Sequence, residues 1–155
     1  MPPPVPLASG LGNGLGNGNR NGFSSAYHGH MIVFCCNDLI FATKIRSAAE
    51  AIGIPCRPAR DAMMLAARLD QVDDGKLNES VTGVVVDLDL GDLAIDLVSQ
   101  VKAHDAALPV TVFGSHVETE RLGRARDAGA DFVMARSTFT EALPDVLRRL
   151  AGPDP

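Results

Sequence analysis

The chain has 155 residues, and 46% of them are hydrophobic, which suits one domain built around a single core. Its formal charge of −5 at pH 7 provides no general basic field, so we expect neither nucleic acid nor a membrane as a partner. Three cysteines, Cys35, Cys36 and Cys56, fit neither a disulfide framework nor a zinc site. We therefore predict a protein of the reducing cytoplasm.

The first residues differ in composition from all that follow. Residues 1–28 are mostly Pro, Gly, Asn and small side chains, with an imperfect LGNG repeat. Such a segment cannot bury enough apolar surface to offset its ordering entropy, so we predict a disordered tail. Residues 29–152 then form the folded domain, and residues 153–155 are a short second tail.

Strand and helix patterns alternate along the domain. The predicted strands lie at residues 31–36, 54–57, 81–87, 109–113 and 131–135. The first predicted helix is capped by Asp38 and stopped by Gly53, and the others lie at 61–72, 92–104, 117–128 and 140–150. Residues 73–80 are polar and predict a loop. Pro144 must lie in the first turn of the last helix or kink it.

The strands are continuous apolar runs, which is typical of strands that are covered on both faces. Five of them, each followed by a helix, predict a doubly wound α/β fold with a parallel sheet. Ligands in such folds bind at the carboxyl ends of the strands. Those ends fall at residues 36–38, 87–89, 114–116 and 136–138.

Three segments carry a resemblance to a known family. They are VVVDLDL at the third strand, LPVTVF at the fourth, and DAGADFVMARS around the fifth. In order and spacing they resemble the receiver domains of two-component response regulators, and the resemblance covers about residues 31–150. It implies a flavodoxin-like fold with strand order 2-1-3-4-5.

The resemblance also implies where the family's phosphorylation site would fall. The phosphoacceptor position is Asp87, and the two acidic residues that help to hold Mg²⁺ correspond to Cys36 and Asn37. The hydroxyl that bonds the phosphoryl group corresponds to Gly114, and the lysine that pairs with it corresponds to Arg136. Because most of the needed chemistry is missing, the chain looks like a pseudo-receiver, and we expect no metal site and no cofactor.

Substitutes for the lost groups lie nearby in the sequence. Asp38 or Asp89 could replace the acidic pair, and Ser115 follows the missing hydroxyl position. One alternative is therefore a conventional receiver that binds Mg²⁺ and takes phosphate on Asp87 from a histidine kinase. A contrasting hypothesis is that Arg136 pairs with Asp87 and occupies the space that a phosphate would use.

The family's conformational switch also lacks its parts in this chain. Gly114 has no side chain to move toward a phosphate. The switch aromatic corresponds to Val133, while Phe132 points to the other face of the strand by the two-residue period. This pattern favours a module that does not depend on phosphorylation.

The predicted fourth helix is highly charged and includes Arg121, Arg124 and Arg126. The resemblance implies that the face made by this helix, the fifth strand and the fifth helix serves as a dimer or partner surface. We therefore predict a stand-alone receiver-like protein, not an enzyme, that acts in signal transduction by binding a protein partner, with a histidine kinase as one candidate.

A second alternative is a small flavodoxin-like enzyme or ligand-binding protein. Its crevice would combine Cys36, Asp87 and His116. The simpler interpretation is that Cys36 fills space and that Asp87 only caps the following loop. His28 and His30 have a spacing that suits a metal chelate, but surface histidines are the better explanation because no third ligand is evident.

Overall fold

The computed structural model describes residues 29–73, 76–77 and 79–152. The two predicted tails, residues 1–28 and 153–155, lie outside the described residues.

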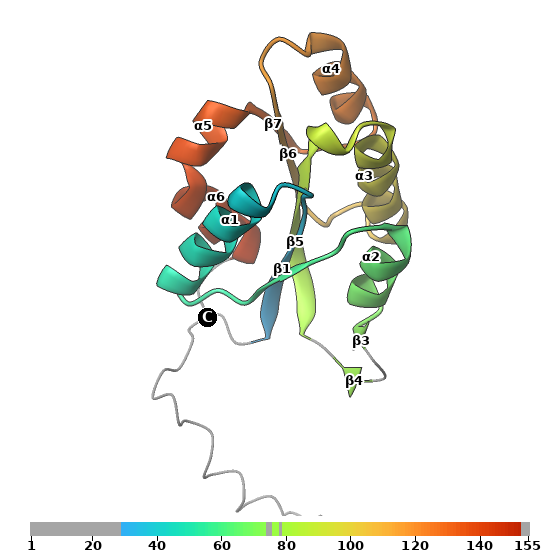
Figure 1. The fold of residues 1–155 in the computed structure, drawn as a ribbon. Helices are drawn as coiled ribbons and strands as arrows, with labels where there is room; N and C mark the ends of the chain where they lie inside the picture. The colour runs from blue at the N-terminus through green and yellow to red at the C-terminus, as the bar shows by residue number, and fades with distance from the viewer. Residues whose placement is uncertain (1–28, 74–75, 78, 153–155) are drawn as a thin grey trace, which may run out of the picture.

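The described part of the chain contains a five-stranded parallel sheet (Figure 1). Its strands are β1 His30–Cys35, β2 Cys56–Pro58, β5 Ser80–Asp87, β6 Val110–Gly114 and β7 Phe132–Ala135. They are arranged in the order β2-β1-β5-β6-β7, and each neighbouring pair is parallel. This is the predicted order 2-1-3-4-5, so the predicted fold class is confirmed.

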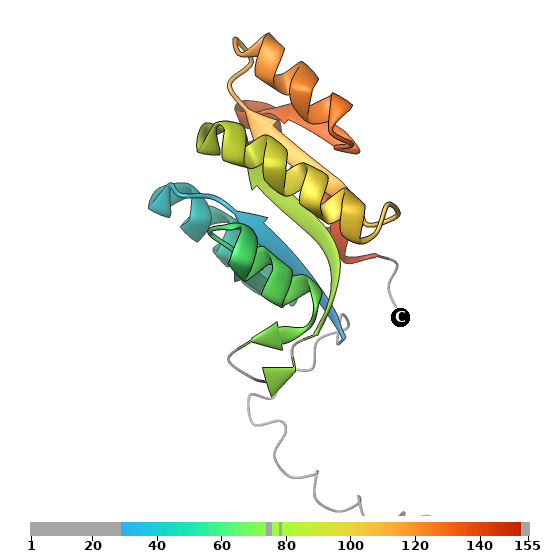
Figure 2. The same cartoon turned by 90° about the vertical axis from the view of Figure 1, so that its right-hand side faces the viewer.

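Helices cover both faces of the sheet, as Figures 1 and 2 show. Helices α2 Ala62–Leu69, α3 Asp92–His104 and α4 Thr119–Asp127 lie on one face. Helices α1 Leu39–Ala51, α5 Arg136–Glu141 and α6 Leu143–Ala151 lie on the other. A short 3₁₀ helix, η3 Leu88–Leu90, follows β5.

The apolar strands supply two cores, one on each face of the sheet. Along β1, Ile32 and Phe34 belong to the core beneath α1 and α6, whereas Val33 and Cys35 belong to the core beneath α2 and α3. All four side chains are buried because a strand places alternate residues on opposite faces. The continuous apolar pattern of the central strands therefore has a direct physical cause.

The end of the chain differs from the prediction of one helix over residues 140–150. Helix α5 already begins at Arg136, and a break at Ala142 separates it from α6. Pro144 lies in the first turn of α6, where its missing N–H has no intrahelical partner to lose. The proline thus starts a new helix, which explains why the pattern before it was misassigned.

The predicted second helix and the loop after it also need correction. Helix α2 ends at Leu69 instead of residue 72, and Gln71 adopts a left-handed backbone with φ of 63°. The chain then forms a two-stranded antiparallel hairpin, with Val72–Asp73 as β3 and Lys76–Leu77 as β4. The left-handed residue reverses the chain direction before the helix can continue.

Candidate functional site

Asp87 is the last residue of β5, and its side chain is only 2% exposed. Its Oδ1 atom accepts a hydrogen bond of 2.9 Å from the backbone N–H of Asp89 and so caps η3. The capping role that we gave as the simpler interpretation is therefore present. The carboxylate also has two side-chain partners, Arg136 and Cys36.

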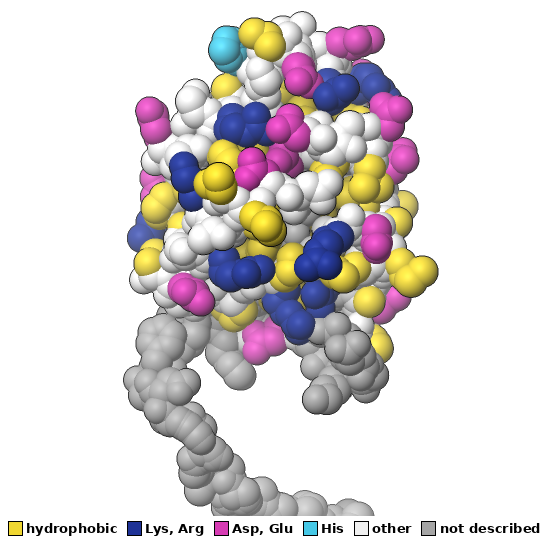
Figure 3. Space-filling model, viewed as in Figure 1, with side chains coloured by type: hydrophobic (Ala, Val, Ile, Leu, Met, Phe, Trp, Pro, Cys, Tyr) yellow, Lys and Arg dark blue, Asp and Glu magenta, His cyan; other side chains and the backbone are white. Residues whose placement is uncertain are grey.

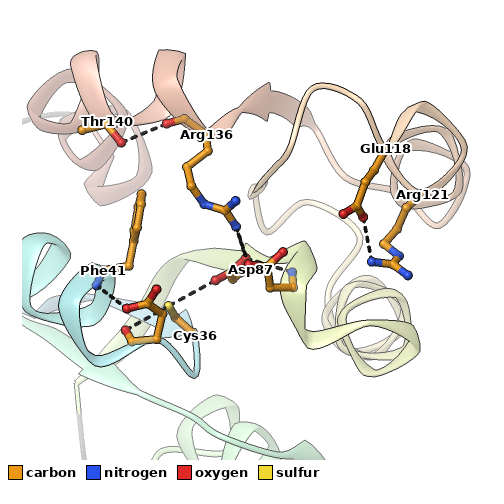
Figure 4. A network of polar contacts seen from close by, with 9 residues as sticks. Cys36, Phe41, Asp87, Glu118, Arg121, Arg136 and Thr140 are labelled. Atoms are coloured by element: carbon orange, nitrogen blue, oxygen red, sulfur yellow. Dashed lines mark hydrogen bonds and ion pairs between the residues drawn. The ribbon is translucent and has the colours of Figure 1, made fainter.

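Arg136 is the strongest of these partners. Its Nη2 atom lies 2.8 Å from Oδ1 of Asp87 and 3.0 Å from Oδ2 of Asp89 (Figure 4). The hypothesised pairing of Arg136 with Asp87 is present in the structure. A charge-assisted contact of this length to a buried carboxylate is a strong hydrogen bond. Asp89, which we considered as a substitute metal ligand, is instead a second carboxylate that pairs with Arg136.

The Arg136 guanidinium also lies over aromatic rings. Its Cζ atom is 5.5 Å from the ring centre of Phe41 and 5.4 Å from that of Phe113. Both rings stack with Phe139, with 6.1 Å between the centres of Phe41 and Phe139 and 4.3 Å between those of Phe113 and Phe139. The cation is therefore attracted by the ring faces as well as by the carboxylates. The sequence reasoning missed this cluster, because the three phenylalanines lie far apart along the chain.

Cys36 donates a third hydrogen bond to the Asp87 carboxylate. Its Sγ atom lies 3.3 Å from Oδ2 of Asp87 and 3.6 Å from the carbonyl oxygen of Asp38. Burial, together with the negative charge of Asp87, raises the pKa of Cys36 to about 12. The group therefore stays a neutral thiol at neutral pH, where it acts as a donor. A position that is acidic in the resembled family thus carries a donor that satisfies Asp87.

The charge balance of the site follows from these contacts. Burial raises the pKa of Asp87, while the Asp89 N–H, the Cys36 thiol and Arg136 offset part of that rise. Burial acts to lower the pKa of Arg136, but the charges of Asp87 and Asp89 outweigh it and raise the pKa. The guanidinium is therefore a fixed cation.

The residues at this strand end do not fit Mg²⁺. Asn37 is exposed and brings no charge, and the Asp38 carboxylate is occupied as the N-cap of α1, with 2.8 Å to the N–H of Ile40. Within the described ranges, no three His, Cys, Asp or Glu side chains gather in a way that could hold a metal ion. Asp87 is already neutralised by Arg136, so the anionic oxygen set that magnesium requires is not assembled.

Gly114 stands where the resembled family has a hydroxyl side chain, and the space beside it is filled by Leu88. A Cβ atom on Gly114 would lie 2.9 Å from Cβ of Leu88, and Leu88 is buried at 1% exposure. A serine or threonine at this position would have to displace Leu88. Ser115, the predicted substitute, accepts a 3.4 Å contact from the N–H of Val117 and so belongs to its own turn.

The remaining predicted residues do not join this cluster. His116 is exposed, and among the described residues no hydrogen bond links it to Cys36 or Asp87. His30 lies at the other end of β1, where its Nδ1 atom is 2.7 Å from the carbonyl oxygen of Ala151. His28 lies outside the described residues. Of the crevice cluster of the enzyme alternative, the structure brings Cys36 and Asp87 together and leaves His116 outside.

Val133 and Phe132 lie on opposite faces of β7, as the strand period predicts. Val133 packs against the core beneath α2 and α3, whereas Phe132 is 39% exposed and lies 4.6 Å beneath the guanidinium of Arg149. The aromatic side chain on this strand is thus held at the surface by α6.

The arginines proposed as interface residues lie on α4. Arg121 pairs with Glu118 at 2.7 Å, and Arg124 pairs with Asp92 at 3.2 Å. Arg126 is exposed. A surface hollow at the start of the helix is lined by residues 117–121 and Arg124. No helix in the described ranges is long and apolar enough to cross a membrane.

Comparisons with known proteins bear on the fold. No family model and no curated protein matches the sequence. Among solved structures, the phosphorylated cyanobacterial phytochrome response regulator RcpA is similar, with a TM-score of 0.65 and 14% identity, over 79% of this chain and 94% of that one. A response regulator from Thermotoga maritima has a TM-score of 0.63 and 15% identity, over 79% of this chain and 98% of that one.

An orphan response regulator of H. pylori is also similar, with a TM-score of 0.60 and 15% identity, over 78% of this chain and 96% of that one. Identities this low establish the shared architecture alone. The chain therefore has the flavodoxin-like fold of response-regulator receiver domains.

Proposed function

We propose that this chain is a receiver-like signalling module that acts by binding a protein partner and does not depend on phosphorylation of Asp87. The receiver fold supports the signalling role. The observation that carries the proposal is the ion pair between Arg136 and Asp87, with 2.8 Å between Nη2 and Oδ1. The negative charge of Asp87 is therefore balanced by a cation of the same chain.

Phosphoryl transfer to Asp87 would need a free carboxylate oxygen and positive charge around the transferred group. Here Oδ1 accepts from Arg136 and from the Asp89 N–H, and Oδ2 accepts from Cys36. The side chain is 2% exposed, so an incoming donor would have to displace the guanidinium first. These contacts argue against the alternative of a conventional receiver.

The enzyme alternative is weaker still. A nucleophilic cysteine requires a thiolate at neutral pH, and the pKa of Cys36 is raised to about 12. Its sulfur donates to the Asp87 carboxylate at 3.3 Å, and that carboxylate is paired with Arg136.

The predicted partner surface around α4 and the cytoplasmic location remain part of the proposal. Arg126 on α4 and the neighbouring Val117, 71% exposed, are accessible for a partner or a second copy. A change in sedimentation or retention volume with protein concentration, which Arg126→Glu should abolish, tests whether this surface forms a dimer.

The three cysteines bear on the proposed location. Cys35, Cys36 and Cys56 are free thiols, which suits a reducing compartment.

The deciding experiment is incubation of the full chain with Mg²⁺ and acetyl phosphate, and separately with beryllofluoride. Intact mass reports a covalent adduct, and amide chemical shifts report a bound mimic at the carboxyl ends of β1, β5 and β6. We expect neither in the wild type. A conventional receiver treated in parallel shows that the reagents are active. An adduct that disappears in Asp87→Asn would refute the proposal.

A further inference from the structure

Positive charge is unevenly distributed over the described chain. Residues 39–69, which form α1, β2 and α2, carry five Lys or Arg and two Asp or Glu, a net charge of +3. Residues 80–152 carry seven basic and eleven acidic side chains, a net charge of −4. The segment that forms α1, β2 and α2 is therefore basic, although the whole chain is acidic.

Four of these basic residues are arginines that gather around the edge strand β2. Arg57 is the middle residue of β2, and Arg60 follows two residues after its end. Arg46 on α1 lies 5.6 Å from the ring centre of Phe34, and its charge acts on the thiol of Cys56 in β2. Figure 3 shows several dark blue side chains across its lower half, over the teal-green part of the chain that runs from α1 to α2 in Figure 1. We call Arg46, Arg57 and Arg60 the β2 basic surface.

The fourth arginine closes the edge of the sheet. Arg68 is buried, and its Nε atom donates a 3.0 Å hydrogen bond to the carbonyl oxygen of Pro58. Pro58 itself has no N–H to offer to a further strand. Pro58 therefore offers neither a free carbonyl oxygen nor an N–H to a further strand, which favours recognition of this edge through side-chain charge.

Two of the arginines on this surface, Arg46 and Arg60, carry charges that no nearby acid of the described residues balances. Arg46 and Arg60 are exposed, and within the described ranges neither lies within ion-pair distance of an acid. The nearby Asp61 carboxylate is engaged as the N-cap of α2, 2.8 Å from the N–H of Met64. By contrast, Arg121 and Arg124 on α4 already have acidic partners.

We propose that the β2 basic surface binds an acidic segment of a protein partner. Planar guanidinium groups match carboxylates in two-point contacts, so an all-arginine surface is suited to this ligand. A nucleic acid is less suitable, because a long polyanion would also meet the net negative charge of the remaining chain. This surface involves neither Asp87 nor Arg136, so binding there is independent of the proposed role of their ion pair.

The test measures binding of a fluorescent poly-glutamate peptide to the full chain by anisotropy at low and at physiological salt. We expect salt-dependent binding, with amide shifts confined to α1, β2 and the start of α2. Arg46→Glu with Arg60→Glu should weaken the affinity about tenfold or more, because attraction at two positions becomes repulsion. Both side chains are exposed, and an unchanged amide spectrum elsewhere confirms that the variant folds.

The matched control is Arg121→Glu with Arg124→Glu, which changes the net charge by the same amount on α4. We expect this control to retain peptide binding. Equal loss in both variants would overturn the proposal, since it would show a response to net charge alone. Tighter binding of an oligothymidylate of equal charge would overturn it in favour of nucleic acid. Self-association that Arg46→Glu with Arg60→Glu abolishes would overturn it in favour of a second copy.

Discussion

Replacing Arg136 with methionine tests whether the buried carboxylate of Asp87 depends on its cation. Breaking a buried ion pair by removing one partner costs about 3–5 kcal/mol, because an uncompensated charge remains. Asp87 keeps its bonds from Cys36 and from the Asp89 N–H, and the Arg136 side chain is 29% exposed. We therefore expect the lower end, a loss of about 3 kcal/mol in the free energy of unfolding, measured by urea denaturation at neutral pH.

The double variant Asp87→Asn with Arg136→Met separates charge from packing. With both charges removed no buried carboxylate is left uncompensated, and Asp89 is exposed to water, so we expect the double variant to recover about 2 kcal/mol relative to Arg136→Met alone. Asp87→Asn alone should cost about 1 kcal/mol, because Arg136 retains Asp89 at 3.0 Å. A double variant no more stable than Arg136→Met would refute the reasoning.

The same pair gives a dependence on pH. Burial raises the pKa of Asp87 above its usual 3.8, so the folded state binds this proton more tightly than the unfolded chain does. This group therefore lowers the stability as the pH rises from 3.8 to the folded pKa. In Arg136→Met the folded pKa rises further, and the stability difference from wild type should shrink as the pH falls. A difference that does not change with pH would contradict this account.

Three further substitutions test the packing, each by thermal and urea unfolding. Gly83→Ala should cost about 2 kcal/mol, because the new Cβ atom would lie 2.6 Å from Cβ of Leu150 and 2.9 Å from its carbonyl oxygen. Gly123→Ala, within α4 and with open space around it, should instead gain about 0.5–1 kcal/mol, and a loss there would contradict the helix assignment. Gly114→Ser should cost about 1–3 kcal/mol through its clash with Leu88 and should not create a phosphorylation site; a neutral effect would show that Leu88 moves freely.

The sequence was sufficient to predict the architecture. Continuous apolar runs identified the buried central strands, and helix α3 begins and ends at the predicted residues, Asp92 and His104. The misassigned end of the chain followed from a local ambiguity. Residues 136–141 lack a strong apolar period, and Pro144 fits either the first turn of a helix or a kink within one. Helix α5 contacts β6 and β7, and these tertiary contacts cannot be read from the apolar pattern of the sequence.

The site was predictable in its charges and not in its packing. The topology placed Arg136 and Asp87 at the same edge of the sheet, so their pairing could be hypothesised from the sequence. The ring cluster beneath Arg136 and the occupation of the space at Gly114 by Leu88 depend on side-chain directions that strand and helix periods do not specify. The donor role of Cys36 required its burial, which raises the pKa of the thiol.

The cation that balances Asp87 is covalently part of the same polypeptide. A dissolved ion must compete with a tethered one, whose effective concentration is fixed by the fold and not by the surrounding solution. On the proposed function, the charge at this strand end does not respond to the magnesium or the phosphoryl-donor level of a cell. On the proposed function, occupancy of the partner follows from the number of copies present, so synthesis and degradation of the protein, not its chemical modification, set the strength of the signal.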